Sequence, residues 1–220
     1  MTTNKSNLTT FEDPLYLLPR TLRKLHSLWL AWTYPFVSIG RRVSVHPTCD
    51  LRRAMAPYVR LGSQILLEKN ARLDVVLIPR KNDPVIIIDD GCVIGQGGII
   101  LGINNIHIER NVIFGPSILV TDHNHTFDDV TIPISQQGAA GGTVRIEEGC
   151  WIGFGTAIVA SQGDLVIGKN SVIGVNSVVT RSIPPYSVAT GNPARVVKQY
   201  DVEKKQWVIG SSGATNRSQG

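Results

Sequence analysis

Aliphatic residues recur at every sixth position through the middle of the chain. The unbroken series consists of Ile88, Ile94, Ile100, Ile106, Val112 and Ile118, all of them β-branched. Six is neither the period of an α-helix nor the two-residue period of one long strand. A six-residue step is expected when a short strand and a bend return an inward-facing side chain to the same axial column. Three such steps predict one turn of a triangular coil with an aliphatic interior.

The same spacing occurs elsewhere in the chain. Its members are Ile39, Val45 and Leu51, then Ile146, Ile152 and Ile158, then Ile167, Ile173 and Val179. Small residues stand two places before many of these positions, as a tight inner corner requires: Cys49, Cys92, Gly98, Cys150, Thr156, Ser171 and Ser177. Because all three cysteines fall in this slot, we interpret them as small buried hydrophobes rather than as a disulfide or metal site.

Residues 52–84 are harder to place. Leu61, Leu67 and Leu73 are six apart and Ala71 occupies a small-residue slot, which suggests another coil followed by a loop at 80–84. The pattern does not fix the register of this region.

Two interruptions break the phase of the coil. Between Ile118 and Ile146 lie 28 steps, which is not a multiple of six, so residues 121–143 are expected to leave the coil as a loop. This loop contains a His-x-His pair, and functional residues often lie on loops held by a rigid scaffold. The second interruption, three extra residues near 161–163, predicts a turn.

Residues 14–36 have a helical pattern instead. The apolar residues Leu15, Leu18, Leu22, Leu25, Trp29 and Trp32 share one face, and Arg20, Arg23, Lys24 and His26 lie outside it. This predicts an amphipathic helix. Its apolar face either packs on the end or side of the coil, or lies on an anionic membrane surface. The net charge of +5 is compatible with both interpretations.

Length and composition suggest one domain with appendages. We expect an amino-terminal segment and helix at 1–37, the coil at 38–198 and a partly disordered tail at 199–220. Aromatic residues are only 6% of the chain, which suits a narrow aliphatic interior. The chain has no run of 18 apolar residues and no signal-peptide pattern, so we expect a cytoplasmic protein. Scattered basic residues without an aromatic platform argue against nucleic-acid binding.

Three stretches carry a resemblance to a known family: IDDGCVIGQGGI, IEEGCWIGFGTAIV and VIGKNSVIGVNSVVTRSIPPYSVATGNPARVVK. They resemble the hexapeptide-repeat acyltransferases, over residues 85–198, and are most similar to sugar acetyltransferases of the maltose, galactoside and surface-polysaccharide types. The resemblance implies an all-β, left-handed parallel β-helix, a homotrimer, acetyl-CoA as cosubstrate and no metal. The winding hand comes from the resemblance alone, because general topology rules favour right-handed crossovers.

The resemblance also implies one histidine as general base, removing a proton from an acceptor hydroxyl or amine that attacks the acetyl thioester. A neutral imidazole suits this task. In the run VTDHNHTFDD, counting nine residues from Pro116 as in the maltose and galactoside enzymes favours His125. His125 also fits a xenobiotic-acetyltransferase pattern. His123 follows Thr121 in the Thr-x-His arrangement of galactoside enzymes, and it remains the alternative.

The same loop offers residues for the acceptor. Asp122, Asn124 and Asp128 are the candidate substrate-binding residues, and one of the carboxylates Asp122, Asp128 and Asp129 is expected to orient the catalytic imidazole. The sequence does not indicate which one. Surface decoration by a loop histidine is the plainer interpretation.

For acetyl-CoA, the resemblance implicates Trp151, Gly153, Gly155, Arg181 and Arg195. Trp151 matches the position beside the cofactor channel, and the two glycines let the pantetheine arm approach the backbone. Both arginines match residues that face the CoA phosphates. The competing interpretations are a corner tryptophan and solvated surface charges.

One departure concerns the acceptor. The maltose and galactoside enzymes carry an asparagine one coil earlier that contacts the sugar, whereas this chain has Gln96, Gly97 and Gly98. We therefore expect a different acceptor, and the amphipathic segment would suit one on a nucleotide or lipid carrier. Whether transfer is to oxygen or nitrogen stays open.

Two other functions use the same coil. A γ-class carbonic anhydrase would need separated histidines, and His107, His123 and His125 supply the number but not the spacing. A non-catalytic coil for assembly or binding is the other alternative.

Overall fold

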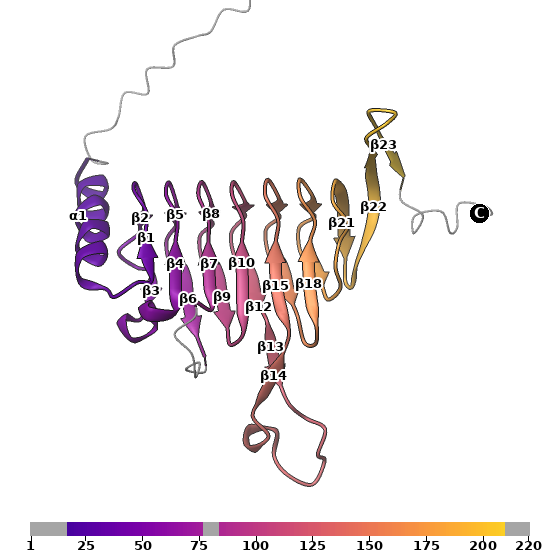
Figure 1. Cartoon of the computed structure of the whole chain (residues 1–220), viewed down its shortest axis with the longest axis horizontal. Helices are drawn as coiled ribbons and strands as arrows, with labels where there is room; N and C mark the ends of the chain where they lie inside the picture. The colour runs from indigo at the N-terminus through magenta and orange to yellow at the C-terminus, as the bar shows by residue number, and fades with distance from the viewer. Residues whose placement is uncertain (1–16, 77–83, 210–220) are drawn as a thin grey trace, which may run out of the picture.

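The computed structural model describes residues 17–76 and 84–209. Its strands stack into an all-β, left-handed parallel β-helix built from three sheets, as predicted (Figure 1). The first sheet contains β1 (Ser38–Ile39), β4 (Val59–Leu61), β7 (Ile86–Ile88), β10 (Asn105–Ile108), β15 (Thr143–Ile146) and β18 (Asp164–Ile167). The third contains β3 (Asp50–Leu51), β6 (Arg72–Val75), β9 (Ile99–Gly102), β12 (Leu119–Thr121), β17 (Ala157–Val159) and β20 (Val178–Val179).

The second sheet runs the full length of the coil and ends in a hairpin. Its strands are β2 (Ser44–Val45), β5 (Leu66–Leu67), β8 (Val93–Ile94), β11 (Ile113–Phe114), β16 (Trp151–Ile152), β19 (Val172–Ile173), β21 (Ser187–Gly191), β22 (Ala194–Asp201) and β23 (Gln206–Ile209). The last two pairings are antiparallel. Residues 199–209 therefore continue this sheet, and the tail from residue 210 lies outside the described residues.

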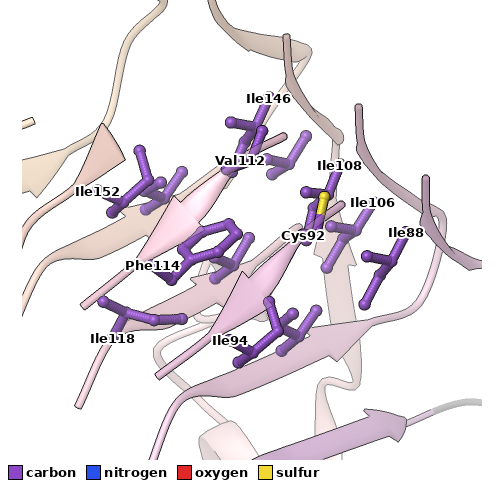
Figure 2. Close-up of a cluster of buried hydrophobic side chains, with 14 of the residues drawn as sticks. Ile88, Cys92, Ile94, Ile106, Ile108, Val112, Phe114, Ile118, Ile146 and Ile152 are labelled. Carbon is purple, nitrogen blue, oxygen red and sulfur yellow. The ribbon is translucent and has the colours of Figure 1, made fainter. Parts of the chain in front are cut away.

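The aliphatic series points inward, but it is not one column. All six members from Ile88 to Ile118 are at most 1% exposed. Three six-residue steps would pair Ile88 with Ile106, one coil later. Instead, Ile88 pairs in register with Ile108 and Ile100 with Val120, so the prediction of an unbroken six-residue count is wrong. Eight residues rather than six separate Ile100 from Ile108, because the turn between β9 and β10 contains two extra residues. The side chains of successive coils fill the interior together (Figure 2).

The coil that the sequence left unphased is present. Leu61 pairs in register with Ile88, and Leu73 with Ile100. A short 3-10 helix, η2 (Arg53–Tyr58), links it to the coil before it. The loop expected at 80–84 falls mainly outside the described residues.

The three cysteines lie at inner corners with free thiols. Cys92 and Cys150 are buried and Cys49 is half-buried. The Cys92 thiol donates to the carbonyl of Glu109, in the next coil, at 3.0 Å. Burial raises the pKa of each thiol to about 11.

Helix α1 (Leu17–Thr33) packs on the first coil, at one end of the molecule (Figure 1). The buried residues are Ser27 and Leu30, and the Val45 N–H donates to Ser27 Oγ at 2.9 Å. The predicted apolar stripe is instead 51–87% exposed at Leu18, Leu22, Leu25, Trp29 and Trp32. The interpretation that this stripe shields the coil is therefore wrong for the single chain. In the described residues, no helix is long and apolar enough to cross a membrane.

Candidate active site

A hairpin leaves the coil where the sequence predicted a loop. After β12, strand β13 (His123–His125) pairs antiparallel with β14 (Ala139–Gly141), and the coil resumes at β15. The hairpin projects from the side of the stack, with the short 3-10 helix η3 (Ile134–Gln136) in its loop (Figure 1). The second predicted turn, at 161–163, is also present as a bend.

Asp122 is the anchor at the base of this hairpin. Its side chain is fully buried, and its carboxylate accepts backbone N–H bonds from Ile103, Asn104 and Asn105, each at 2.9 Å. Consecutive backbone N–H groups form a concave site that stabilises an anion. Two of these donors are the extra residues of the β9–β10 turn, so the insertion that the sequence pattern concealed fixes this carboxylate. The Asn104 amide also donates to the carbonyl of Gly142 at 2.9 Å, at the other end of the hairpin.

His123 contacts this anchored carboxylate. Its Nδ1 lies 3.0 Å from Asp122 Oδ1 and 3.1 Å from Thr121 Oγ1, and the side chain is only 12% exposed. If the Nδ1–H donates to Asp122, the neutral ring carries its free lone pair on Nε2. Within the described residues Nε2 has no hydrogen-bond partner, which leaves it available to a substrate.

The other loop candidates do not join this pair. His125 is exposed, and in the described part of the chain its ring makes no hydrogen bond or ion pair. The Asn124 amide donates to Ser161 Oγ at 2.7 Å, and Asp128 is exposed. Asp129 accepts hydrogen bonds from the hydroxyl and the backbone N–H of Thr131, and these bonds lower the pKa of Asp129. Of the three carboxylates considered, only Asp122 contacts an imidazole.

Two glycines close the hairpin base. A Cβ on Gly141 would overlap the carbonyl oxygen of Asp122, and one on Gly142 would overlap that of Gly163. The Gly142 N–H donates to the Asp122 carbonyl at 2.9 Å. The close approach of these strands therefore holds Asp122 and His123 in place. The glycine pair was visible in the sequence, but its partners were not.

The candidate CoA residues lie on another part of the coil. Trp151, in β16 of the second sheet, is 55% exposed, whereas His123 continues from β12 of the third sheet. A Cβ on Gly153 would lie 2.8 Å from Val175 N, and Gly155 has a left-handed φ of +67°. Coil packing alone thus requires Gly153, whereas Gly155 lies at a corner where Ser117 and Asn176 of the neighbouring coils also adopt a positive φ.

The two candidate phosphate-binding arginines are exposed. Arg195 Nη1 donates to the carbonyl of Ala194 at 2.9 Å, and Arg181 follows β20. Because both side chains are exposed, their charge is accessible to solvent.

The histidines of the metalloenzyme alternative belong to separate pairs. His107 Nε2 lies 2.8 Å from Asp89 Oδ2, on the outer face of the first sheet, while His123 contacts Asp122. Across residues 17–76 and 84–209, no three His, Cys, Asp or Glu side chains form a group suited to a metal ion.

Comparisons with known proteins find acetyltransferases among the relatives of this chain. No family model matches the chain. It is 30% identical over 167 residues to a "Probable acetyltransferase" of Mycobacterium tuberculosis, covering 76% of this chain and 51% of that protein. It is 36% identical over 114 residues to the galactoside O-acetyltransferase of Lactococcus lactis, covering 46% of this chain and 50% of that protein. The chain thus spans about half the length of these relatives.

Solved structures share the coil. The maltose O-acetyltransferase of Clostridium difficile is 25% identical, with a TM-score of 0.51 and coverage of 85% of this chain and 89% of that one. AntD, an N-acyltransferase from Bacillus cereus, has a TM-score of 0.64 at 16% identity, covering 82% and 91%; that crystal contains dTDP-4-amino-4,6-dideoxyglucose and coenzyme A. The likeness to AntD concerns the fold alone. The resemblance to sugar acetyltransferases expected from the sequence is confirmed.

Proposed function

Because the chain shares its coil and part of its sequence with hexapeptide-repeat sugar acetyltransferases, we propose that it transfers an acetyl group from acetyl-CoA to a hydroxyl or amine of a sugar. The observation that carries this proposal is the contact between His123 and the buried Asp122, at the base of the only hairpin that leaves the coil between β12 and β15. A regular coil needs no such pair to fold.

In this mechanism His123 is the general base, in preference to His125, which the sequence favoured. Nε2 accepts the proton of the acceptor hydroxyl or amine while the acceptor atom attacks the thioester carbonyl. Asp122 holds the Nδ1–H and stabilises the imidazolium that forms. The tetrahedral intermediate then collapses with cleavage of the carbon–sulfur bond. The imidazolium returns its proton to the CoA sulfur, so the products are acetylated acceptor and free CoA thiol.

The cofactor site in this proposal is assembled between subunits. Trp151, Gly153, Gly155, Arg181 and Arg195 would bind acetyl-CoA. Trp151 and Arg195 lie in the second sheet, Gly153 and Gly155 in the turn after β16, and Arg181 after β20, whereas His123 follows β12. A homotrimer would place this surface of one subunit beside the hairpin of its neighbour. Coenzyme A would therefore protect the assembled protein against dissociation as well as against unfolding.

For the acceptor we propose a carrier-linked sugar of surface-polysaccharide synthesis, with Asn124 and Asp128 binding it. AntD, which shares the fold, was crystallised with a nucleotide-linked amino sugar, which supports a nucleotide carrier. Such precursors are built in the cytoplasm, where we place the protein. Residues 14–36 would contact the membrane peripherally, and the exposed apolar side of α1 supports this contact.

A thioester-release assay tests the activity. Acetyl-CoA is supplied with a panel of nucleotide sugars, both hydroxyl and amino, together with galactosides, and free CoA thiol is measured. We expect turnover with at least one nucleotide sugar and a higher melting temperature with CoA. Absence of turnover across the panel, together with no stabilisation by CoA, would instead indicate a non-catalytic coil.

A further inference from the structure

A basic groove lies between α1 and the first coils, far from the hairpin. Its volume is about 920 Å³. Its cationic lining comes from three elements: Arg20, Arg23 and Lys24 of α1, Arg41 and Arg42 in the turn between β1 and β2, and Lys69 after β5. Leu28, Ala31, Ile39 and Val43 supply an apolar lining between them. A groove of this composition suits a ligand with both an anionic and an apolar part.

The charge of the groove is largely uncompensated. No carboxylate is among its lining in the described residues, and Arg23 lies 3.5 Å from the carboxylate of Glu68, just outside that lining. Lys24, Arg41 and Lys69 make no ion pair with the described parts of the chain. His46 lines the same groove, and its pKa is lowered chiefly by burial and secondly by the charges of Arg23 and Lys69. Clustered cations of this kind raise the local concentration of anions.

The outer side of α1 is apolar at this same end of the molecule. Ser27 and Leu30 face the coil, whereas Leu22, Trp29 and Trp32 are 51–87% exposed. Leu28, at the edge of the groove, is 59% exposed and joins the two surfaces. A helix with an apolar face, interfacial tryptophans and adjoining cations is the pattern of a segment that lies in a membrane interface.

We propose that this groove binds the phosphate-bearing headgroup of an anionic phospholipid while the apolar side of α1 enters the interface. The phosphate would bind Arg41, Arg42 and Lys69 at the corner of the coil. The acyl chains would lie against the exposed apolar side chains of α1. A soluble phosphate would account for the groove but not for the exposed leucines and tryptophans beside it. The inference rests on the peripheral membrane contact proposed above and not on acetyl transfer.

This site is separate from the catalytic one. Helix α1 packs against the first coil, and His123 follows β12 in the fourth. Three inter-strand steps of about 4.8 Å separate these coils along the axis. A headgroup in the groove therefore docks the protein and is not the acceptor, so vesicle binding and acetyl transfer are measured independently.

The test is co-sedimentation of the full chain with vesicles of phosphatidylcholine alone or of phosphatidylcholine with phosphatidylglycerol. We expect binding to the anionic vesicles only. The double variant Arg41→Glu with Lys69→Glu should weaken it at least tenfold, because each basic residue near an anionic surface contributes to binding. The matched control, Lys198→Glu with Lys205→Glu, changes the net charge equally at the other end of the coil and should bind within about twofold of the parent chain. Both variants should retain the parent melting temperature and turnover.

Four outcomes would overturn the inference. Equal weakening in the control would indicate net charge rather than a site. Equal binding to neutral vesicles would indicate apolar insertion alone. Failure to bind any vesicle, with glycerol phosphate stabilising the parent but not the groove variant, would indicate a soluble phosphate ligand. Failure to bind vesicles with concentration-dependent burial of the tryptophans would indicate that a second copy covers α1.

Discussion

Two histidine–aspartate pairs on this coil have nearly the same length and very different surroundings. His107 Nε2 lies 2.8 Å from Asp89 Oδ2, and His123 Nδ1 lies 3.0 Å from Asp122 Oδ1. The Asp89 side chain is 31% exposed and also approaches Arg60, at 3.4 Å. The Asp122 side chain is fully buried and held by backbone N–H groups.

The distance between histidine and aspartate therefore does not by itself mark a catalytic site. A half-exposed carboxylate on a sheet surface can reorient and share its charge with neighbours. A carboxylate fixed by the backbone keeps its imidazole in one orientation and one tautomer, and such preorganisation is what lowers a reaction barrier. Of the two Asp–His pairs, only Asp122–His123 at the hairpin base has a carboxylate fixed by backbone N–H groups.

Replacement of the two imidazoles should separate the pairs most strongly. We expect His123→Ala to lower turnover by about two to four orders of magnitude, because the acceptor then loses its general base. His107→Ala is the matched control and should leave turnover within about threefold. Both are measured by CoA release at saturating acetyl-CoA. A large loss in His125→Ala together with a small one in His123→Ala would return the assignment to His125.

Replacement of the two carboxylates should give the next largest difference. Asp122→Asn should lower turnover by about one to three orders of magnitude, since an amide neither stabilises an imidazolium nor fixes the tautomer equally well. Asp89→Asn should have little effect on turnover. Steady-state kinetics with circular dichroism as a folding control measures both. Equal effects of the two variants would mean that the anchoring of Asp122 is irrelevant to catalysis.

The hairpin base should tolerate a methyl group less well than the hairpin loop. Gly142→Ala places a Cβ against the carbonyl of Gly163, so we expect the free energy of unfolding to fall by about 2–4 kcal/mol. Gly138 lies in the same hairpin with open space around it and a φ of +80°, so Gly138→Ala should cost only about 1 kcal/mol. Urea unfolding compares the two. A smaller loss for Gly142→Ala would show that the hairpin base shifts easily.

Replacement of the buried cysteines Cys92 and Cys150 should have the smallest effect, a change in the free energy of unfolding that is seen only at alkaline pH. Burial raises the pKa of Cys92 and Cys150 from 9.0 to about 11, so the folded state keeps their protons longer than the unfolded state does. The resulting stability is complete below pH 9 and is lost as the pH rises toward 11. By pH 9.5 the loss is about 0.8 kcal/mol per thiol at most. Cys92→Ser with Cys150→Ser should flatten the pH dependence of urea unfolding, and an unchanged dependence would contradict this origin.

The sequence predicted the coil and a loop at 121–143 that carries two histidines, because a six-residue period and its interruptions are local properties. The strand pairing of β13 with β14 was not predicted. The sequence concealed the two-residue insertion before β10, since Ile106 and Ile108 both face inward and the six-residue count continued through the first of them. For this reason it also left open which carboxylate orients the base. Asp122 is distinguished by its backbone N–H donors in the turn between β9 and β10 and by its contact with His123.

The prediction that the apolar stripe of the amino-terminal helix shields the coil was wrong for a different reason. The stripe itself was clear, but pattern alone does not say what a stripe packs against. The end of the coil is covered by Ser27 and Leu30, with Ser27 accepting from the Val45 N–H, so the larger residues remain outside. The acceptor and the subunit contacts could not be predicted either. Both depend on which surfaces of the folded protein meet a ligand or another subunit, and one sequence does not contain that information.

A crystal structure of the protein with CoA and an acceptor would show directly whether His123 is the general base. We predict that the acceptor oxygen or nitrogen lies about 3 Å from His123 Nε2, within reach of the CoA sulfur, with Asp122 still bonded to Nδ1. An acceptor atom placed against His125 or His107, or a CoA sulfur far from the hairpin base, would show that His123 and Asp122 are not the catalytic pair.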